Sequence, residues 1–150
     1  MLEKLFPQPA DDNYHGHKLG KWLLIFYTVK SFVAGSIHMF AADGGAQSIA
    51  SITLDQFSQG AADSIVTIFG LWGLEQVVIG VVAAMMLWRY KSLIPFMALV
   101  YAIEYIGRFA SHWYTPGVTT VHTPPGAVAD TVLVPLALVM LVLSLWERKE

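Results

Sequence analysis

The chain of 150 residues contains no cysteine, and this absence excludes disulfides, thiolate catalysis and cysteine-ligated metal sites. Charged residues are also scarce: they make up 13% of the chain, against about 25% in typical soluble domains. The net charge of −2 provides no basic surface, so no nucleic-acid partner is expected. Hydrophobic residues dominate instead, at 55%, and this balance predicts a protein that is surrounded by lipid.

Four apolar runs follow one another along the chain, at residues 22–42, 65–88, 93–113 and 128–146. Each is about 20 residues long, the length at which an α-helix crosses a hydrocarbon core of ~30 Å. A membrane-spanning backbone must satisfy its hydrogen bonds as a helix or a closed barrel, and the runs lack the alternation of barrel strands. The sequence therefore predicts an all-α fold, a bundle of four transmembrane helices.

The distribution of basic residues predicts the orientation of this bundle. The loops 43–62 and 114–127 contain no lysine or arginine. The chain before the first run, the link between the second and third runs and the chain after the fourth run all contain them. The basic residues that flank the runs are Lys18, Lys21, Arg89, Lys91, Arg148 and Lys149. Cytoplasmic segments carry such an excess of positive charge. We therefore expect residues 1–20 to form a cytoplasmic tail and residues 21–150 a transmembrane domain with both termini in the cytoplasm, in the inner membrane of a bacterium.

The two loops expected outside the membrane have features of their own. Ile49, Ile52 and Phe57 give the first loop an apolar stripe, which predicts a short helix on the outer membrane surface. In the second loop, Pro125 is placed to begin the fourth helix, because proline is favoured at the first helical position.

Five charged residues lie within or at the edge of the apolar runs: Lys30, Glu75, Glu104, Arg108 and Asp130. A charged side chain at the bilayer centre costs about 2.5–3.5 kcal/mol on insertion scales. Such residues usually face the interior of a bundle and mark a functional site. Their spacing places them on inward stripes of the helices, so the sequence predicts a buried polar pocket that opens toward the outside.

Polar and aromatic neighbours on the same stripes extend this pocket. We expect Glu75 and Glu104 to act as an acid–base pair, since two carboxyl groups near a membrane midplane can share one proton. Lys30 and Arg108 are suited to an anionic head group such as a carboxylate or phosphate. The expected ligand-binding residues are Lys30, Tyr27, His38, Trp72, Gln76, Arg108, His112 and Asp130.

Each of these residues also has a structural interpretation. Glu104 and Arg108 have the i,i+4 spacing of a salt bridge within one helix. Lys30 and Glu75 are possible partners in a second ion pair, and Asp130 lies in the first turns of its helix, where an acid interacts favourably with the helix dipole. The histidines 38 and 112 fit the role of hydrogen-bonded side chains near the interface. The sequence leaves both interpretations open.

The sequence does not identify a cofactor. A bis-histidine haem requires His38 and His112 to face one another at one depth, and a non-haem metal requires Glu75, Glu104 and a histidine to converge. His38 and His112 share an outer level, which leaves the haem open, whereas no spaced histidine motif supports the non-haem metal. We therefore predict no metal site and no particular cofactor.

Three stretches resemble the DoxX-like group of small four-helix membrane proteins: the glycine-rich second run with its embedded acid (GLWGLEQVVIGVV), the short basic turn (WRYKS) and the end of the third run (EYIGRFASHW). The resemblance covers roughly residues 20–147. It implies a four-helix transmembrane fold and, because some members look like accessory subunits of membrane oxidoreductases, a possible place in a larger complex.

Three functions are compatible with these features. The first is binding of a small hydrophobic or amphiphilic ligand in the polar pocket. The second is an accessory subunit of a larger membrane complex, for oxidoreduction or transport. The third is an acid–base enzyme that acts on a lipid-like substrate through Glu75 and Glu104. The expected partners are the lipid bilayer, the ligand and either further copies of the chain or a larger membrane complex, with Gly70, Gly73 and Gly80 available for close helix contacts.

Overall fold

The computed structural model describes residues 2–114 and 120–146, with the side chains of 112–114 left out. All regular elements in these residues are helical, which confirms the all-α class predicted from the sequence. The elements, in order, are α1 (Leu2–Leu5), α2 (Lys18–Phe40), the 3-10 turn η1 (Leu54–Gln56), α3 (Gln59–Arg89), the 3-10 turn η2 (Lys91–Leu93), α4 (Ile94–Tyr114) and α5 (Pro125–Leu145).

Four of these helices, α2, α3, α4 and α5, are long and apolar enough to cross a membrane, as the sequence predicted. The bounds differ most for α3, which has 31 residues and begins at Gln59 rather than at Ile65. Its first turns are polar and lie outside the apolar run, but they still form helix, so α3 is about 46 Å long and exceeds the ~30 Å hydrocarbon core. As expected, α5 begins at Pro125.

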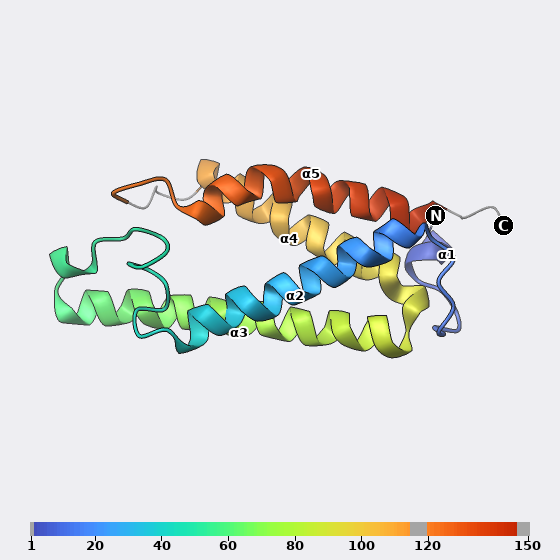
Figure 1. The fold of residues 1–150 in the computed structure, drawn as a ribbon, viewed down its shortest axis with the longest axis horizontal. Coiled ribbons are helices and arrows are strands. Elements are labelled where there is room, and N and C mark those ends of the chain that lie inside the picture. Colours follow the sequence, from blue (N-terminus) through green and yellow to red (C-terminus); the bar gives the residue numbers. More distant parts are fainter. Residues whose placement is uncertain (1, 115–119, 147–150) are drawn as a thin grey trace.

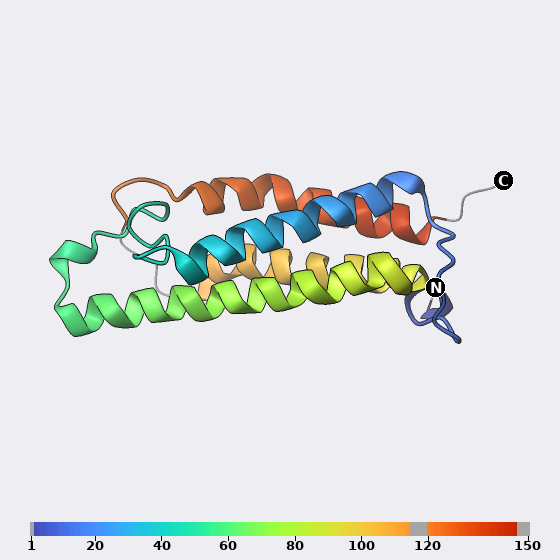
Figure 2. The same ribbon diagram turned by 60° about the horizontal axis from the view of Figure 1, so that its bottom comes forward.

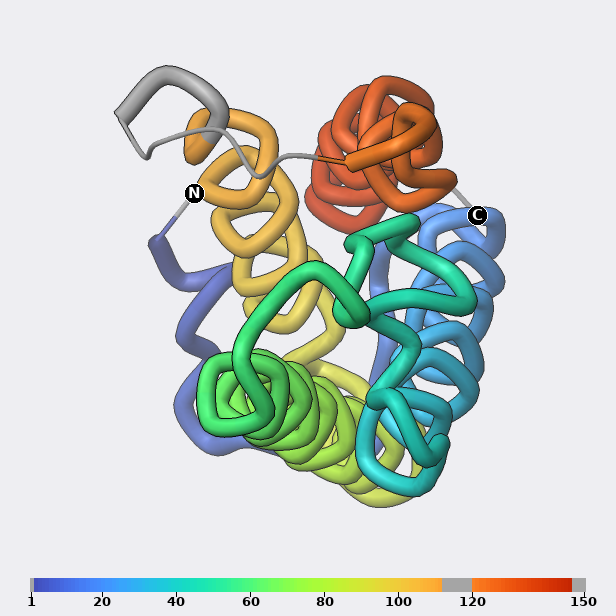
Figure 3. Tube along the Cα trace, turned by 90° about the vertical axis from the view of Figure 1, so that its left-hand side faces the viewer, coloured from blue at the N-terminus to red at the C-terminus, as the bar shows by residue number. Residues whose placement is uncertain are grey.

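The helices run antiparallel to their neighbours in the chain, so the bundle has two distinct ends (Figure 1). The residues before α2, the α3–α4 link and the last turn of α5 lie at one end, here called the terminal end. The loop 41–58 and the first turn of α5 lie at the other, here called the loop end. The most extensive helix contacts join α2 to α3 and α4 to α5. The view along the bundle in Figure 3 shows these two pairs side by side.

Helix α2 crosses the bundle obliquely, beside α5 at the terminal end and beside α3 at the loop end (Figures 1 and 2). Glycines allow both close approaches. A Cβ atom on Gly20 would lie 3.0 Å from the backbone nitrogen of Ser144 in α5, and one on Gly35 would lie 2.7 Å from the backbone oxygen of Gly73 in α3. Because a Cβ atom would not fit at Gly35 or Gly73, these two glycines permit the close contact of α2 with α3 at the loop end.

The core at the terminal half is closed by an aromatic layer. Tyr27 lies with its ring centre 5.3 Å from that of Tyr101 and 5.1 Å from that of Tyr105, and all three side chains are buried. The hydroxyl of Tyr27 donates to the backbone oxygen of Leu133 in α5. This layer joins α2, α4 and α5 and lies on the side of the polar site that is nearer the terminal end.

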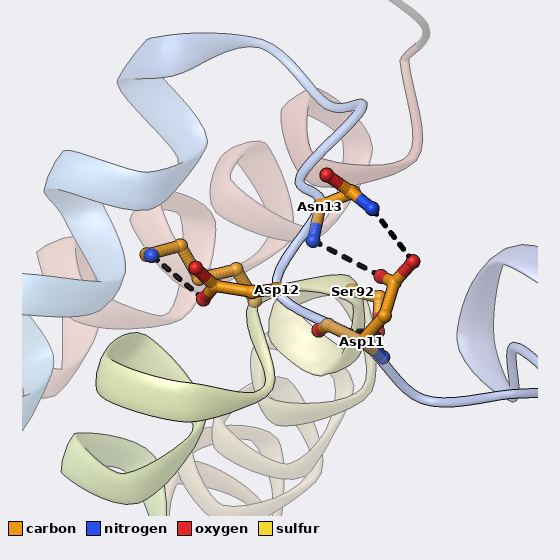
Figure 4. A network of polar contacts seen from close by, with 5 residues as sticks. Asp11, Asp12, Asn13 and Ser92 are labelled. Carbon is orange, nitrogen blue, oxygen red and sulfur yellow. Dashed lines mark hydrogen bonds and ion pairs between the residues drawn. The ribbon is translucent and has the colours of Figure 1, made fainter.

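Residues 2–17, which belong to the tail expected over residues 1–20, pack on the terminal end of the bundle. Asp11 and Ser92 exchange three hydrogen bonds, among them the Asp11 N–H to the Ser92 hydroxyl at 2.8 Å. Asp12 pairs with Lys91 at 2.7 Å, and Asn13 donates to both oxygens of the Asp11 carboxylate (Figure 4). These contacts attach the segment to the α3–α4 link.

The loop 41–58 is ordered by one acidic side chain and contains the single 3-10 turn η1 where the sequence predicted a short helix. The carboxylate of Asp43 accepts hydrogen bonds from the backbone N–H groups of Gly45, Gln47 and Ser48. Burial alone would raise the pKa of Asp43, but these bonds and one from the Ser48 hydroxyl outweigh it and lower the pKa to about 2. The position of the loop on a membrane surface stays a prediction.

Candidate functional site

A cavity of about 770 Å³ lies in the half of the bundle nearer the loop end. This volume is within the usual range of about 300–1,000 Å³ for ligand sites. All four long helices and the loop 41–58 contribute to its wall. Among the residues predicted to bind a ligand, those that line it are Lys30, His38, Trp72, Gln76, Arg108 and Asp130.

Arg108 is the centre of the polar wall and contacts groups from three helices. Its guanidinium lies 3.4 Å from Glu104 Oε1 on α4 and 3.6 Å from Asp130 Oδ1 on α5. The same group lies 4.9 Å from the centre of the Trp72 ring and 5.0 Å from that of Tyr105. The predicted Glu104–Arg108 pair is therefore present, and Asp130 interacts with it from a neighbouring helix rather than acting only on the dipole of α5.

Lys30 on α2 also lines this wall, but its ammonium group contacts an aromatic ring, whereas Arg108 is paired with acids. The Lys30 Nζ lies 5.1 Å from the centre of the Tyr105 ring, a cation–π contact. Among the side chains that the structure describes, no hydrogen bond or ion pair joins Lys30 to a protein group. The charged residues that line the cavity are thus two cations, Lys30 and Arg108, and one acid, Asp130. Because Arg108 is paired with Glu104 and Asp130, Lys30 is the lining cation that no carboxylate neutralises among the described residues, and this makes the cavity suitable for an anion.

His38 connects the cavity to the loop that covers it. Its ring stacks on Trp72 with centres 4.6 Å apart, and its Nδ1 lies 2.7 Å from the backbone oxygen of Gly44. Because a carbonyl oxygen only accepts, Nδ1 carries the proton in this contact. His38 lines the cavity, and its hydrogen bond to the loop agrees with the structural interpretation, so a role of His38 in ligand binding stays a prediction.

Buried polar atoms without partners accompany the charged groups. Gln76 is 2% exposed and lines the cavity, and its side-chain Nε2 has no hydrogen-bond partner within the described part of the chain. Glu104 Oε2 and the Tyr105 hydroxyl are buried and unpartnered there too. Buried polar groups are normally satisfied in proteins, so the unpartnered Nε2 of Gln76 indicates a place on the cavity wall where a ligand or water binds.

The structure corrects the prediction for Glu75. The Glu75 side chain is exposed on the outside of the bundle, while the next residue, Gln76, is buried. Glu75 does not line the cavity, and no hydrogen bond or ion pair joins it to Glu104 or Lys30 among the described residues. The predicted pair of carboxyl groups that share a proton is therefore not formed, and neither is a Lys30–Glu75 ion pair. Consecutive residues of a helix point about 100° apart, and this rotation separates Glu75 from the interior.

Tyr27 also differs from the prediction. It does not line the cavity, because its fully buried side chain belongs to the aromatic layer beneath it. His112 is on α4, but its side chain lies outside the described residues. The haem ligation considered for His38 and His112 thus stays untested. Among the described residues, no three His, Asp or Glu side chains are placed to hold a metal ion.

Several wall residues were not predicted. Phe26, Val33 and Ile37 lie with Lys30 along one flank of α2, and Ile49 and Ile52 of the loop 41–58 also line the cavity. The i, i+4, i+7 and i+11 spacing of Phe26, Lys30, Val33 and Ile37 is the signal that could have placed them on one stripe.

No family model, curated protein or solved structure matches the chain. The resemblance to DoxX-like proteins therefore stays a prediction.

Proposed function

We propose that this protein is an integral protein of a bacterial inner membrane, with both termini in the cytoplasm, and that its cavity binds an amphiphile with an anionic head group and a hydrocarbon tail. The observation that carries the proposal is the composition of the cavity wall: Lys30 and Arg108 lie in it with the single acid Asp130, and the rest of the wall is mostly apolar.

The polar wall offers an anionic head group hydrogen-bond donors that have no acceptor among the described residues. The Lys30 ammonium contacts only an aromatic ring among the described residues, and Gln76 Nε2 is an unpartnered buried donor. A carboxylate or phosphate between them would receive charge-assisted hydrogen bonds, which contribute about 1.5–3 kcal/mol each. Arg108 is already bonded to two acids, so in this proposal its main role is to hold the wall together.

The apolar part of the wall supports the tail. Phe26, Val33 and Ile37 of α2 and Phe69 of α3 surround the space next to Lys30. When a hydrocarbon chain moves from water into this space, the burial of its apolar surface is favourable by about 25 cal/mol per Å². The head group then determines the orientation of the ligand, and the tail adds affinity relative to a ligand dissolved in water.

The test compares matched ligands and matched variants. Binding of dodecyl phosphate and of dodecanol to the purified protein in nanodiscs is measured by isothermal titration calorimetry. We expect the phosphate to bind and the alcohol to bind at least about tenfold more weakly, the equivalent of ~1.4 kcal/mol. Lys30→Met should remove this preference, whereas Lys21→Met, a change on the same helix away from the cavity, should keep it. Equal binding of the two ligands by the unchanged protein would refute the proposal.

A second function, that of an accessory subunit, is favoured by the position of Glu75. This acid lies near the middle of α3 on an exposed surface with Leu71, Leu74 and Val78, which are 61%, 45% and 53% exposed. A carboxylate there is costly in lipid and would be stabilised by a lysine or arginine in a transmembrane helix of a partner. Gly73 and Gly80 do not serve this surface, because they pack against Gly35 and Phe32 of the same chain.

The two functions are separable by experiment. If Glu75 faces a partner, Glu75→Leu should leave ligand binding unchanged but shift the migration of the membrane-extracted protein on native gels to a smaller complex. The same migration for both proteins would exclude a complex that depends on Glu75. The third function, acid–base catalysis by Glu75 and Glu104, requires the two acids to share a site, and the exposed position of Glu75 argues against it.

A further inference from the structure

The wall of the cavity formed by α2 is at the same time part of the outer surface of the bundle. Phe26, Val29 and Val33 line the cavity, yet they are 48%, 55% and 57% exposed. A side chain meets both conditions only where the cavity reaches the surface. The cavity therefore opens along the flank of α2 that carries these residues.

This opening follows from the tilt of α2. At the terminal end, Gly20 brings α2 against Ser144 of α5, and Tyr27 bonds to Leu133 farther along, so the two helices are closed against one another. Near Gly35, α2 instead contacts α3. The space between α2 and α5 therefore widens toward the loop end (Figure 1), where Ala127 of α5 lines the cavity.

The loop 41–58 covers part of the cavity at the loop end. Ile49, Ala50 and Ile52 of the loop 41–58 line the cavity there. The backbone N–H of Val121 donates to the backbone oxygen of Ser51 at 3.1 Å, which joins this loop to the segment before α5. The hydrogen bond from His38 to Gly44 fixes the base of the same loop. Two loops are thus bonded across the end that would face water.

In the proposed membrane orientation, the open side lies at the depth of the hydrocarbon. Val29 and Val33 are in the middle of α2, a helix of 23 residues that is long and apolar enough to cross a membrane. Lys30 lies between them on the same helix and lines the cavity, so the cation and the opening are adjacent. A ligand can therefore place its head group at Lys30 while its tail extends out of the cavity between α2 and α5.

On these grounds, and resting on the proposed function, we propose that the ligand is a lipid of the bilayer with an anionic head group, and that it reaches the cavity sideways between α2 and α5 while part of its hydrocarbon stays in the membrane. A carboxylate or a phosphate meets this description, and the source is either a free fatty acid or a phospholipid.

The test uses Trp72, which lines the cavity, as a fluorescent reporter. A variant in which the other four tryptophans are replaced by phenylalanine is placed in nanodiscs, and quenching is measured with lipids brominated in the middle of the acyl chain. We expect brominated phosphatidate or brominated stearate to quench Trp72 several-fold more per mole than brominated phosphatidylcholine, which measures the background from surrounding lipid. The more effective of the two anions identifies the source. A water-soluble amphiphile, 11-bromoundecanoate, tests whether the cavity binds any anionic chain.

The outcomes separate the two proposals. If the soluble amphiphile quenches Trp72 and neither brominated anionic lipid exceeds the background, sideways access is wrong and the proposed function stands. If none of the three exceeds the background, the proposed function is wrong and this inference with it.

A matched pair of variants tests the route itself. Ala127→Phe fills the opening on α5, whereas Ala129→Phe adds the same ring to an exposed position of that helix that does not line the cavity. We expect the first change to reduce the quenching by the anionic lipid several-fold and the second to leave it unchanged. Val33→Phe obstructs the opening from α2 and replaces Ala127→Phe if that variant fails to fold by circular dichroism. Unchanged quenching in a folded obstructed variant would overturn the proposed route.

Discussion

The three-residue network around Arg108 makes a quantitative prediction about stability. The side chains of Arg108, Glu104 and Asp130 are only 18%, 13% and 8% exposed, so their charges are largely removed from solvent. Arg108→Met removes the cation that faces both acids. Removing one member of a buried pair costs about 3–5 kcal/mol, because a charge is left uncompensated. We therefore expect Arg108→Met to lower the free energy of unfolding by about this amount.

The acids should be less sensitive than the arginine. After Glu104→Gln, Arg108 still has Asp130 at 3.6 Å, and the lost contact is a long one of 3.4 Å. The expected loss is therefore about 1–3 kcal/mol. The double change Glu104→Gln with Arg108→Met should still be clearly destabilised, because the charge of Asp130 no longer faces Arg108. Adding Asp130→Asn should recover most of the stability, since no charge of the network then remains.

The assay is reversible unfolding in mixed micelles, followed by circular dichroism as the fraction of denaturing detergent rises. Each variant is compared with the unchanged protein at one pH and ionic strength. The reasoning would be refuted by an Arg108→Met protein within about 1 kcal/mol of the original, or by a triple variant that is less stable than Arg108→Met alone. Either result would mean that Arg108 does not compensate these two acids in the membrane.

Further predictions concern packing, pH and orientation. Gly35→Ala should destabilise the bundle by about 1–3 kcal/mol in the same unfolding assay, because its Cβ would lie 2.7 Å from the backbone oxygen of Gly73, whereas Gly70→Ala, whose nearest contact is at 3.8 Å, should have little effect. The pKa of Asp43 is lowered from 3.8 to about 2 in the folded protein, so its contribution to stability should be present in full above about pH 4 and lost as the pH falls toward 2. An Asp43→Asn protein that shows the same decline over this interval would contradict that assignment. Ser51→Cys, in a chain without other cysteines, should react with a membrane-impermeant maleimide added to right-side-out bacterial cells, and a reaction only with a permeant reagent would reverse the predicted orientation.

Composition and run length alone determined the class of this protein. A scarcity of charge and four runs of about 20 apolar residues leave helices as the way to satisfy the backbone in lipid, and the structure has those four helices. Charge within such runs is costly, so the residues that carry it were recognisable as candidates for a site. The spacing of Glu104 and Arg108 even predicted their contact, because positions four apart in a helix lie on one face.

Only the tertiary structure decided which of these residues share a site. Glu75 and Gln76 are neighbours in sequence, yet one is exposed and the other buried, because the part of α3 that is covered depends on where α2 and α4 pack. Tyr27 is a core residue because α4 and α5 pack over its side chain. The cavity itself results from the tilt of α2, which two glycines on different helices, Gly35 and Gly73, permit by touching. Local sequence specifies the face on which a side chain lies, but what covers that face is set by helices that are distant in the chain.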